Sequence, residues 1–252
     1  MKIVVAIKQV PERDAQIAVA GDGKWIEEGD LAYTINEPDA YALEEALQLK
    51  EKHGGEVIAL SLGPERVTST LREALAKGAD RAIHVEYDGT ESPDTLTLGR
   101  MLAEAIKPES PDLILTGLQS DDLGLGQTGV VLAELLGIPS ATIIMQVEKT
   151  DAGLRVKREL EDGWYQHVEV PLPALLTIQS GGNKLRYATL MGIKKAKNKE
   201  TREVEAAAAE ARVDEVVKVA APERVKRTEM LTGSAEEVAK KIVERVQGLG
   251  IR

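Results

Sequence analysis

The feature that most constrains the fold is a regular alternation of short apolar runs with longer segments of helical periodicity. Lys2–Ile7 (KIVVAI) is a continuous run rich in β-branched residues, which is typical of a strand buried on both faces of a parallel sheet. Similar runs follow at Glu56–Leu62, Arg81–Val85 and Asp112–Thr116. Helical patterns separate and follow them, from Asn36–Asp39 to Gly54–Gly55, from Gly63–Pro64 to Lys77, from Ser92–Asp94 onward, and from Val130 to Gly137. This order predicts an α/β fold, a doubly wound, Rossmann-like parallel sheet.

The alternation of strands and helices ends after Pro139. Three runs read as antiparallel strands, Ala141–Glu148, Leu154–Leu160 and Tyr165–Val170, and Leu172–Ile178 reads as a further buried strand. Glu203–Arg212 is alanine-rich and helix-prone, and Ser234 with Glu237 forms a capping-box pattern before a final amphipathic helix. We therefore expect an α/β nucleotide-binding domain over residues 1–183 that includes a small antiparallel addition at 141–170, a partner-recognition loop at 184–199, and an extended C-terminal arm with a helix over 200–252.

Composition removes several classes of function. The 252 residues include no cysteine and three histidines, so cysteine chemistry is absent and a histidine metal site is not expected. A net charge of −10 and the lack of phenylalanine argue against nucleic-acid binding. No apolar run reaches about 18 residues, and the N-terminus reads as a strand, so we expect neither a membrane-embedded protein nor a signal peptide. No serine elbow, histidine–carboxylate pair or metal set suggests a catalytic site, and His84 reads as a packed or crevice histidine.

A glycine-bearing loop, Gly117–Gly129 (GLQSDDLGLGQTG), lies between a strand and a helix. One interpretation is a tight βα loop with ordinary caps. The other is a site for a nucleotide phosphate on the N–H groups near Gly126–Gly129, with Gln127 and Thr128 as further donors. Asp121 and Asp122 would then bind ribose hydroxyls, cap the helix or face solvent. Asn36–Asp39 is good turn and cap chemistry, or a wall of the same crevice.

A second segment, Lys184–Lys199 (KLRYATLMGIKKAKNK), inverts the sign of the charge. It contains six cations and no acid, with Tyr187, Leu190, Met191 and Ile193 interleaved among them. Such a run is either a solvated face or a docking surface for an acidic partner, since exposed apolar residues within a ring of cations suit reversible association.

Taken in order, these motifs resemble the electron-transfer flavoprotein beta subunit. The resemblance rests above all on Leu185–Lys197 (LRYATLMGIKKAK) after a Leu-Pro-Ala strand start, and it covers nearly the whole chain. Ala6–Val10, Asn36–Lys52, Glu56–Pro64, Ala74–Val85 and the Gln127–Gly129 turn follow in family order. The chain departs from the mitochondrial members at Arg13, where they place a tyrosine near the flavin, at Met191–Gly192, where they have Pro-Asn, and in a more glycine-rich Leu123–Gly126.

The resemblance implies an adenine-nucleotide-binding fold and an electron carrier, not an enzyme, because the cofactor would supply the chemistry. It implies a cytoplasmic heterodimer with an alpha subunit, an FAD near the subunit interface, and a structural AMP in this chain. Flavin dehydrogenases such as acyl-CoA dehydrogenases would be the donors, and a membrane quinone-linked oxidoreductase the acceptor. Two alternatives stay open: an electron-bifurcating form with a second FAD in place of AMP and NADH as donor, and a stand-alone adenine-nucleotide-binding module.

The resemblance also assigns residues. The partner-docking residues would be Leu190 as the anchor, with Tyr187, Met191, Lys194 and Lys197 around it. The cofactor-binding residues would be Ala6, Asn36, Glu37, Pro38, Asp39, Leu62, Gly117, Leu118, Gln119, Ser120, Asp121, Asp122, Leu123, Gly124, Leu125, Gly126, Gln127 and Thr128.

Overall fold

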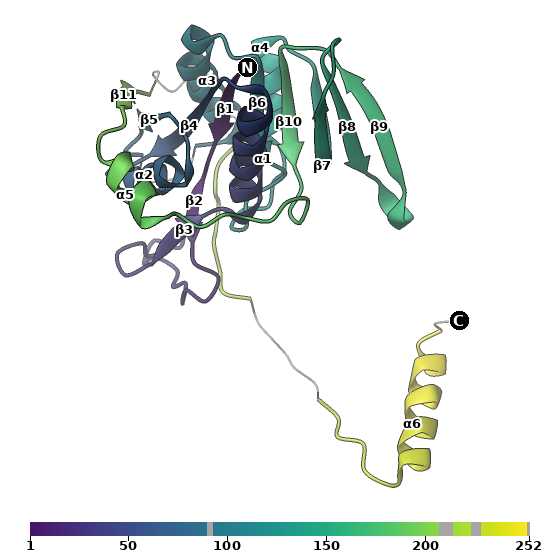
Figure 1. The fold of residues 1–252 in the computed structure, drawn as a ribbon. Helices are drawn as coiled ribbons and strands as arrows, with labels where there is room; N and C mark the ends of the chain where they lie inside the picture. The colour runs from purple at the N-terminus through teal and green to yellow at the C-terminus, as the bar shows by residue number, and fades with distance from the viewer. Residues whose placement is uncertain (90–92, 207–213, 223–227, 251–252) are drawn as a thin grey trace. The chain divides into compact units, whose positions relative to one another are not determined.

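The computed structural model describes residues 1–89, 93–206, 214–222 and 228–250, and it divides into two units, Met1–Val219 and Ala220–Arg252. A nine-stranded sheet forms the centre of the first unit, in the order β11-β5-β4-β1-β6-β10-β7-β8-β9 (Figure 1). Its strands are β1 (Lys2–Ala6), β4 (Glu56–Gly63), β5 (Arg81–Glu86), β6 (Leu113–Gly117), β7 (Ser140–Lys149), β8 (Leu154–Glu159), β9 (Tyr165–Val170), β10 (Ala174–Ile178) and β11 (Thr201–Glu205).

Helices cover both faces of the parallel part of this sheet. On one face lie α1 (Glu37–His53) and α2 (Thr68–Lys77), the latter preceded by the short turn η1 (Glu65–Val67). On the other lie α3 (Thr95–Ile106), followed by η2 (Lys107–Glu109), and α4 (Thr128–Leu136). Within β1, Ile3 and Val5 pack on the α1 side and Val4 on the α3 side, all fully buried. Burial on both faces is why the central strands are continuous apolar runs, and the predicted doubly wound sheet is confirmed.

The antiparallel addition is also confirmed. β7 runs parallel to β10, whereas β8 and β9 follow as antiparallel neighbours, with Val147 opposite Val156 and Val156 opposite Val168. The turn η3 (Glu161–Gly163) joins β8 to β9.

Three strands and one helix were not predicted. A ribbon pairs β2 (Gln9–Pro11) with β3 (Tyr33–Ile35), a short helix α5 (Leu190–Ala196) lies inside the basic segment, and β11 extends the sheet. The prediction that Glu203–Arg212 is helix-prone is wrong at its start, because Glu203 lies in β11 and pairs with His84 of β5. Residues 207–213 lie outside the described residues. Parallel pairing with β5 overrides the local helical propensity. The segment 200–252 was expected to be an extended arm, but it begins with β11, a strand of the main sheet.

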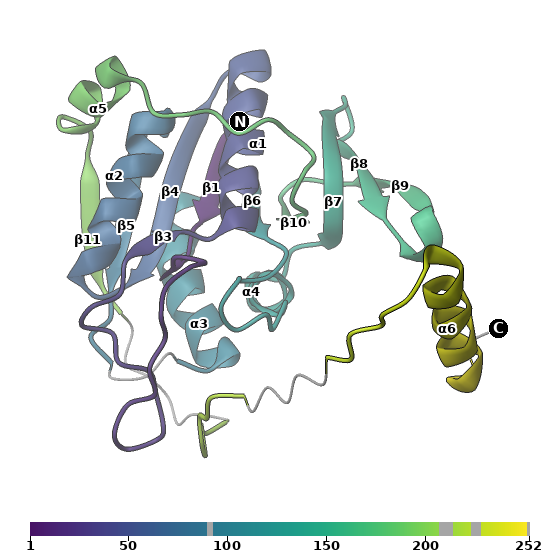
Figure 2. The same ribbon diagram turned by 90° about the horizontal axis from the view of Figure 1, so that it is seen from below.

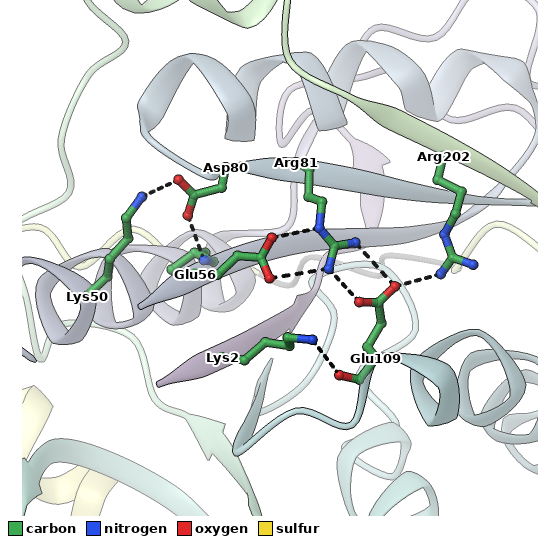
Figure 3. Close-up of polar contacts among 8 residues, drawn as sticks. Lys2, Lys50, Glu56, Asp80, Arg81, Glu109 and Arg202 are labelled. Carbon is green, nitrogen blue, oxygen red and sulfur yellow. Dashed lines mark hydrogen bonds and ion pairs between the residues drawn. The ribbon is translucent and has the colours of Figure 1, made fainter. Parts of the chain in front are cut away.

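A charged cluster closes the amino edge of the sheet (Figure 3). The Arg81 guanidinium donates to Glu56 at 2.7 Å and to Glu109, which also accepts from Arg202 of β11 at 2.9 Å. Lys2 donates to the Glu109 carbonyl at 2.8 Å. The pKa of Glu109 lies below its usual value because the hydrogen bonds from Arg81 outweigh the effect of burial. Through Glu109, the cluster links the beginning of β11 to the first residues of β4 and β5.

The second unit contains α6 (Ala235–Gly248). Its predicted capping box is present: the Ser234 hydroxyl accepts from Glu237 N, and the Glu237 carboxylate accepts from Ser234 N. Ile242, Val243 and Val246 are exposed on this helix. Among the described residues, no helix combines the length and apolarity needed to cross a membrane.

Candidate functional site

The predicted nucleotide residues gather at the carboxyl edge of the sheet. Ala6 and Gly117 end the neighbouring strands β1 and β6, and Leu62 lies near the end of β4 on the other side of β1. After β1 the chain enters α1 on one face, and after β6 it enters α4 on the opposite face. The strand order therefore reverses between β1 and β6, and ligands of such sheets bind at this point.

Asp39, in the first turn of α1, holds the ends of both strands. Its carboxylate accepts from Lys8 N at 2.7 Å and from Gly117 N at 2.8 Å. Only 6% of the residue is exposed, and this burial raises the pKa of Asp39 to about 6, although the two backbone donors and Asn36 oppose the rise. The side chain therefore joins the start of α1 to the ends of β1 and β6 at this edge of the sheet.

Asn36 fastens the glycine loop to the start of α1. Its amide donates to the Gln119 carbonyl at 3.0 Å and accepts from Asp121 N at 2.9 Å. The Asp121 carboxylate accepts from Glu37 N at 3.3 Å, so of the roles left open for Asp121 the structure shows a helix cap, on α1 and not on α4.

Lys8 is not among the residues that the resemblance assigns to the cofactor, although it lies in Ile7–Gln9, a stretch that the sequence predicts at the carboxyl edge of the sheet. Its ammonium binds the Asp122 carboxylate at 2.7 Å, and this ion pair keeps the pKa of Asp122 low despite partial burial. The charge of Asp122 is therefore balanced by Lys8, which reduces its repulsion of an anionic ligand. The signal is its position, because Lys8 lies two residues after the end of β1, the strand next to the switch point. Arg13, which departs from the family pattern, forms an ion pair with Glu37 at the start of α1.

Four glycines of the site stand where a side chain would clash or where the backbone is left-handed. A Cβ on Gly117 would lie 2.4 Å from Asp39 Oδ1, and one on Gly129 would lie 2.6 Å from Thr177 Cγ2. Gly124 and Gly126 adopt φ values of +63° and +64°, which other residues rarely adopt. Residues 121–127 are exposed, and α4 begins at Thr128 with no side-chain cap at Gln127. The N–H groups at that helix start can thus receive an anion, such as a phosphate.

His84 lies outside this arrangement. It is buried, and its Nε2 contacts the Gly63 carbonyl at 2.8 Å, so it is a packed histidine.

The predicted docking residues form an exposed patch on and beside α5. The exposed fraction is 91% for Tyr187, 82% for Leu190 and 62% for Met191. Thr189 caps the helix by accepting from Gly192 N at 3.0 Å, and α5 packs on the end of α2. The side chains of Lys184, Lys194, Lys195 and Lys197 have no hydrogen-bond or ion-pair partner within the described parts of the chain.

Two of the six cations in this segment serve the fold instead. Arg186 binds Glu44 and Glu51 of α1, and Lys199 donates to the carbonyls of Leu75 and Ala79 at the end of α2. The patch and the predicted nucleotide residues lie at opposite ends of the first helices, since α1 begins at the carboxyl edge and ends where the Gly54 carbonyl accepts from the Met1 ammonium.

The sequence is similar to known proteins over most of its length. Residues 24–222 match the model of the electron transfer flavoprotein domain. The chain is 40% identical to the electron transfer flavoprotein subunit beta of Methylophilus methylotrophus, over 97% of each chain. It is 38% identical to the Bacillus subtilis subunit beta over 81% of this chain and 79% of the relative, and 41% identical to the mitochondrial subunit beta of Arabidopsis thaliana over 79% of each.

The chain therefore belongs to the electron transfer flavoprotein family. Within that family it groups with the beta subunits, which makes it an electron-transfer protein rather than a catalyst of its own.

Proposed function

We propose that this chain is the beta half of a heterodimeric electron carrier that assembles with an alpha subunit and takes electrons from flavin dehydrogenases to a quinone-linked acceptor. The observation that carries the proposal is the separation of two surfaces in one chain. The carboxyl edge would hold a nucleotide, whereas an exposed apolar patch lies near the other ends of α1 and α2, among lysines that have no partner in the described parts of the chain.

The ligand that we propose for the carboxyl edge is an adenine mononucleotide. The N–H groups at the start of α4 and the left-handed Gly124 and Gly126 suit a phosphate, and Ala6, Leu62 and Asn36–Asp39 would flank the rest of the ligand. The ion pair of Lys8 with Asp122 reduces repulsion between the loop and a phosphate. We assign AMP a structural role here, because its contacts would join α1, the loop and α4, which carry no reactive constellation.

The flavin of the heterodimer, held mainly by the alpha subunit, would supply the redox chemistry. This chain contributes the docking surface. Leu190 would insert into an apolar pocket of a dehydrogenase, and Lys194, Lys195 and Lys197 would steer an acidic partner toward it. Such association is fast, reversible and sensitive to salt. The exposed apolar face of α6 would pack on the alpha subunit.

Co-expression with an alpha subunit tests the proposal. The expected product is a yellow heterodimer whose flavin is reduced by an acyl-CoA dehydrogenase in the presence of its acyl-CoA substrate. A colourless monomer that does not bind the alpha subunit would overturn the proposal and favour a stand-alone nucleotide-binding module.

One observation supports a second candidate. The loop at Leu123–Gly126 is exposed, and the nearest atom to a Cβ on Gly124 would be the Ser120 carbonyl at 4.0 Å. An open loop of this kind could accommodate a dinucleotide, as an electron-bifurcating form with a second FAD and NADH as donor requires. The number of flavins in each heterodimer separates the two candidates.

A further inference from the structure

The docking segment is held to the body of the protein on both sides of its exposed patch. On the N-terminal side, Asn183 Nδ2 donates to the Glu45 carboxylate at 2.5 Å and Leu185 packs against the core beneath α1. On the C-terminal side, Ala196 is buried and Lys199 reaches the end of α2. Figure 2 shows the segment crossing α1 before it turns into α5 beside α2.

Arg186 is the most extensively bound residue of this segment. Its guanidinium donates to Glu44 at 2.8 and 3.0 Å and to Glu51 at 2.6 and 3.3 Å, and its backbone N–H also donates to Glu44. Only 5% of the Glu44 side chain is exposed. The pKa of Glu44 is lowered because the hydrogen bonds from Arg186 outweigh the effect of burial. The fork geometry of the guanidinium fixes the direction of the chain one residue before Tyr187.

The far side of the patch is fixed by a close backbone approach. A Cβ on Gly192 would lie 2.2 Å from the Ala76 carbonyl, so α5 sits directly on α2 and any side chain there would push it away. Leu190 and Met191 are therefore exposed, but their backbone is held in place, because the chain is bound to the rest of the protein before and after them.

We propose that Arg186, through Glu44 and Glu51, is a positioning residue that presets the geometry of the Tyr187–Met191 patch before a partner arrives. The inference rests on the proposed docking function and refines it: Arg186 is cationic, but its charge is neutralised within the chain and does not face the partner. The charges that steer association are Lys184, Lys194, Lys195 and Lys197. A preset patch saves the ordering cost of docking.

The test compares Arg186→Ala and Glu44→Gln with the matched control Lys184→Ala, all in the heterodimer with the alpha subunit. Lys184 lies two residues away, carries the same charge and has no partner among the described residues. The acyl-CoA dehydrogenase reaction is measured as a function of carrier concentration and of salt. We expect Arg186→Ala and Glu44→Gln each to raise the KM for the carrier about tenfold at unchanged kcat, which corresponds to the ordering of one or two side chains.

Three comparisons distinguish positioning from other roles. The two substitutions together should cost no more than Arg186→Ala alone, since Arg186→Ala already removes the contact with Glu44. Arg186→Ala should leave the slope of log KM against log salt unchanged, whereas Lys184→Ala should reduce it. Hydrogen exchange of the backbone over 187–197 should rise in Arg186→Ala and Glu44→Gln but not in Lys184→Ala.

A reduced salt slope in Arg186→Ala, with normal docking in Glu44→Gln, would show direct contact with the partner and overturn the inference. Unchanged hydrogen exchange in both Arg186→Ala and Glu44→Gln would also overturn the inference, and this result does not depend on any dehydrogenase reaction. If no dehydrogenase reduces the wild-type heterodimer, that result counts against the proposed function alone.

Discussion

Replacement of Gly117 by alanine is the most demanding perturbation of the nucleotide crevice. The added Cβ would lie 2.4 Å from Asp39 Oδ1, 2.7 Å from Pro38 Cβ and 2.8 Å from Asp39 N. The Asp39 carboxylate has little freedom to retreat, because Lys8 N and Gly117 N both donate to it. The first turn of α1 must therefore move away from β6.

The cost has two parts. Overpacking of a tight contact costs about 1–3 kcal/mol, and loss of a hydrogen bond to a buried carboxylate costs about 1.5–3 kcal/mol. Since one movement causes both, we expect a decrease of about 3 kcal/mol in the free energy of unfolding, rather than the full sum.

Urea denaturation followed by circular dichroism measures this change, with Gly21→Ala as the matched control. A Cβ on Gly21 would have no neighbour within 4 Å, so this variant should remain within about 0.5 kcal/mol of the wild type. Gly117→Ala should also lose bound nucleotide from the heterodimer. A stability equal to that of Gly21→Ala, with nucleotide retained, would refute the close contact between β6 and α1.

Three further predictions concern Asp39, Arg81 and Leu190. The pKa of Asp39 is about 6 when folded against a usual 3.8, so its contribution to stability is fully present below 3.8 and is lost as the pH rises through 6. The stability of the wild type relative to Asp39→Asn should therefore rise by about 1.3 kcal/mol from pH 7 to pH 5 in urea denaturation; a fall would contradict this. Arg81→Ala should cost about 3 kcal/mol, because it leaves Glu109 buried without its main partner. The control Arg155→Ala, which breaks an exposed pair of 3.8 Å, should cost less than about 0.5 kcal/mol. Leu190→Ala should raise the KM for the carrier about tenfold at unchanged flavin content, whereas the equally apolar, exposed Leu160→Ala should not; equal KM values would exclude the anchor role.

The sequence was sufficient for the central sheet because its strands are buried on both faces. Continuous apolar runs such as that at Lys2–Ile7 have few alternative placements, and glycine or proline marks the ends of the helices between them. Short or polar elements carry a weaker signal. The ribbon of β2 and β3 has three residues in each strand, and β11 (TREVE) alternates half-buried with exposed residues, so pairing with neighbours decides both.

The sequence predicts which segments form the candidate sites, but not the hydrogen bonds and ion pairs between them. The glycine loop and Asn36–Asp39 do meet at the switch point, yet the role of Lys8 depends on Asp122, 114 residues away. The basic segment reads as one patch of six cations, although Arg186 binds Glu44 across 142 residues and Lys199 binds Leu75 across 124. Partners so distant in sequence leave no local pattern, so only the folded chain distinguishes the cations that bind within it from those that remain exposed.

The central claim is that this chain holds an inert adenine mononucleotide while the flavin resides at the interface with the alpha subunit. Denaturation of the purified heterodimer, followed by chromatography of the released nucleotides, tests it most directly. We predict one FAD and one AMP for each heterodimer, with AMP alone reduced in Gly117→Ala. Two FAD molecules without AMP would contradict the claim and identify the crevice as a second redox site.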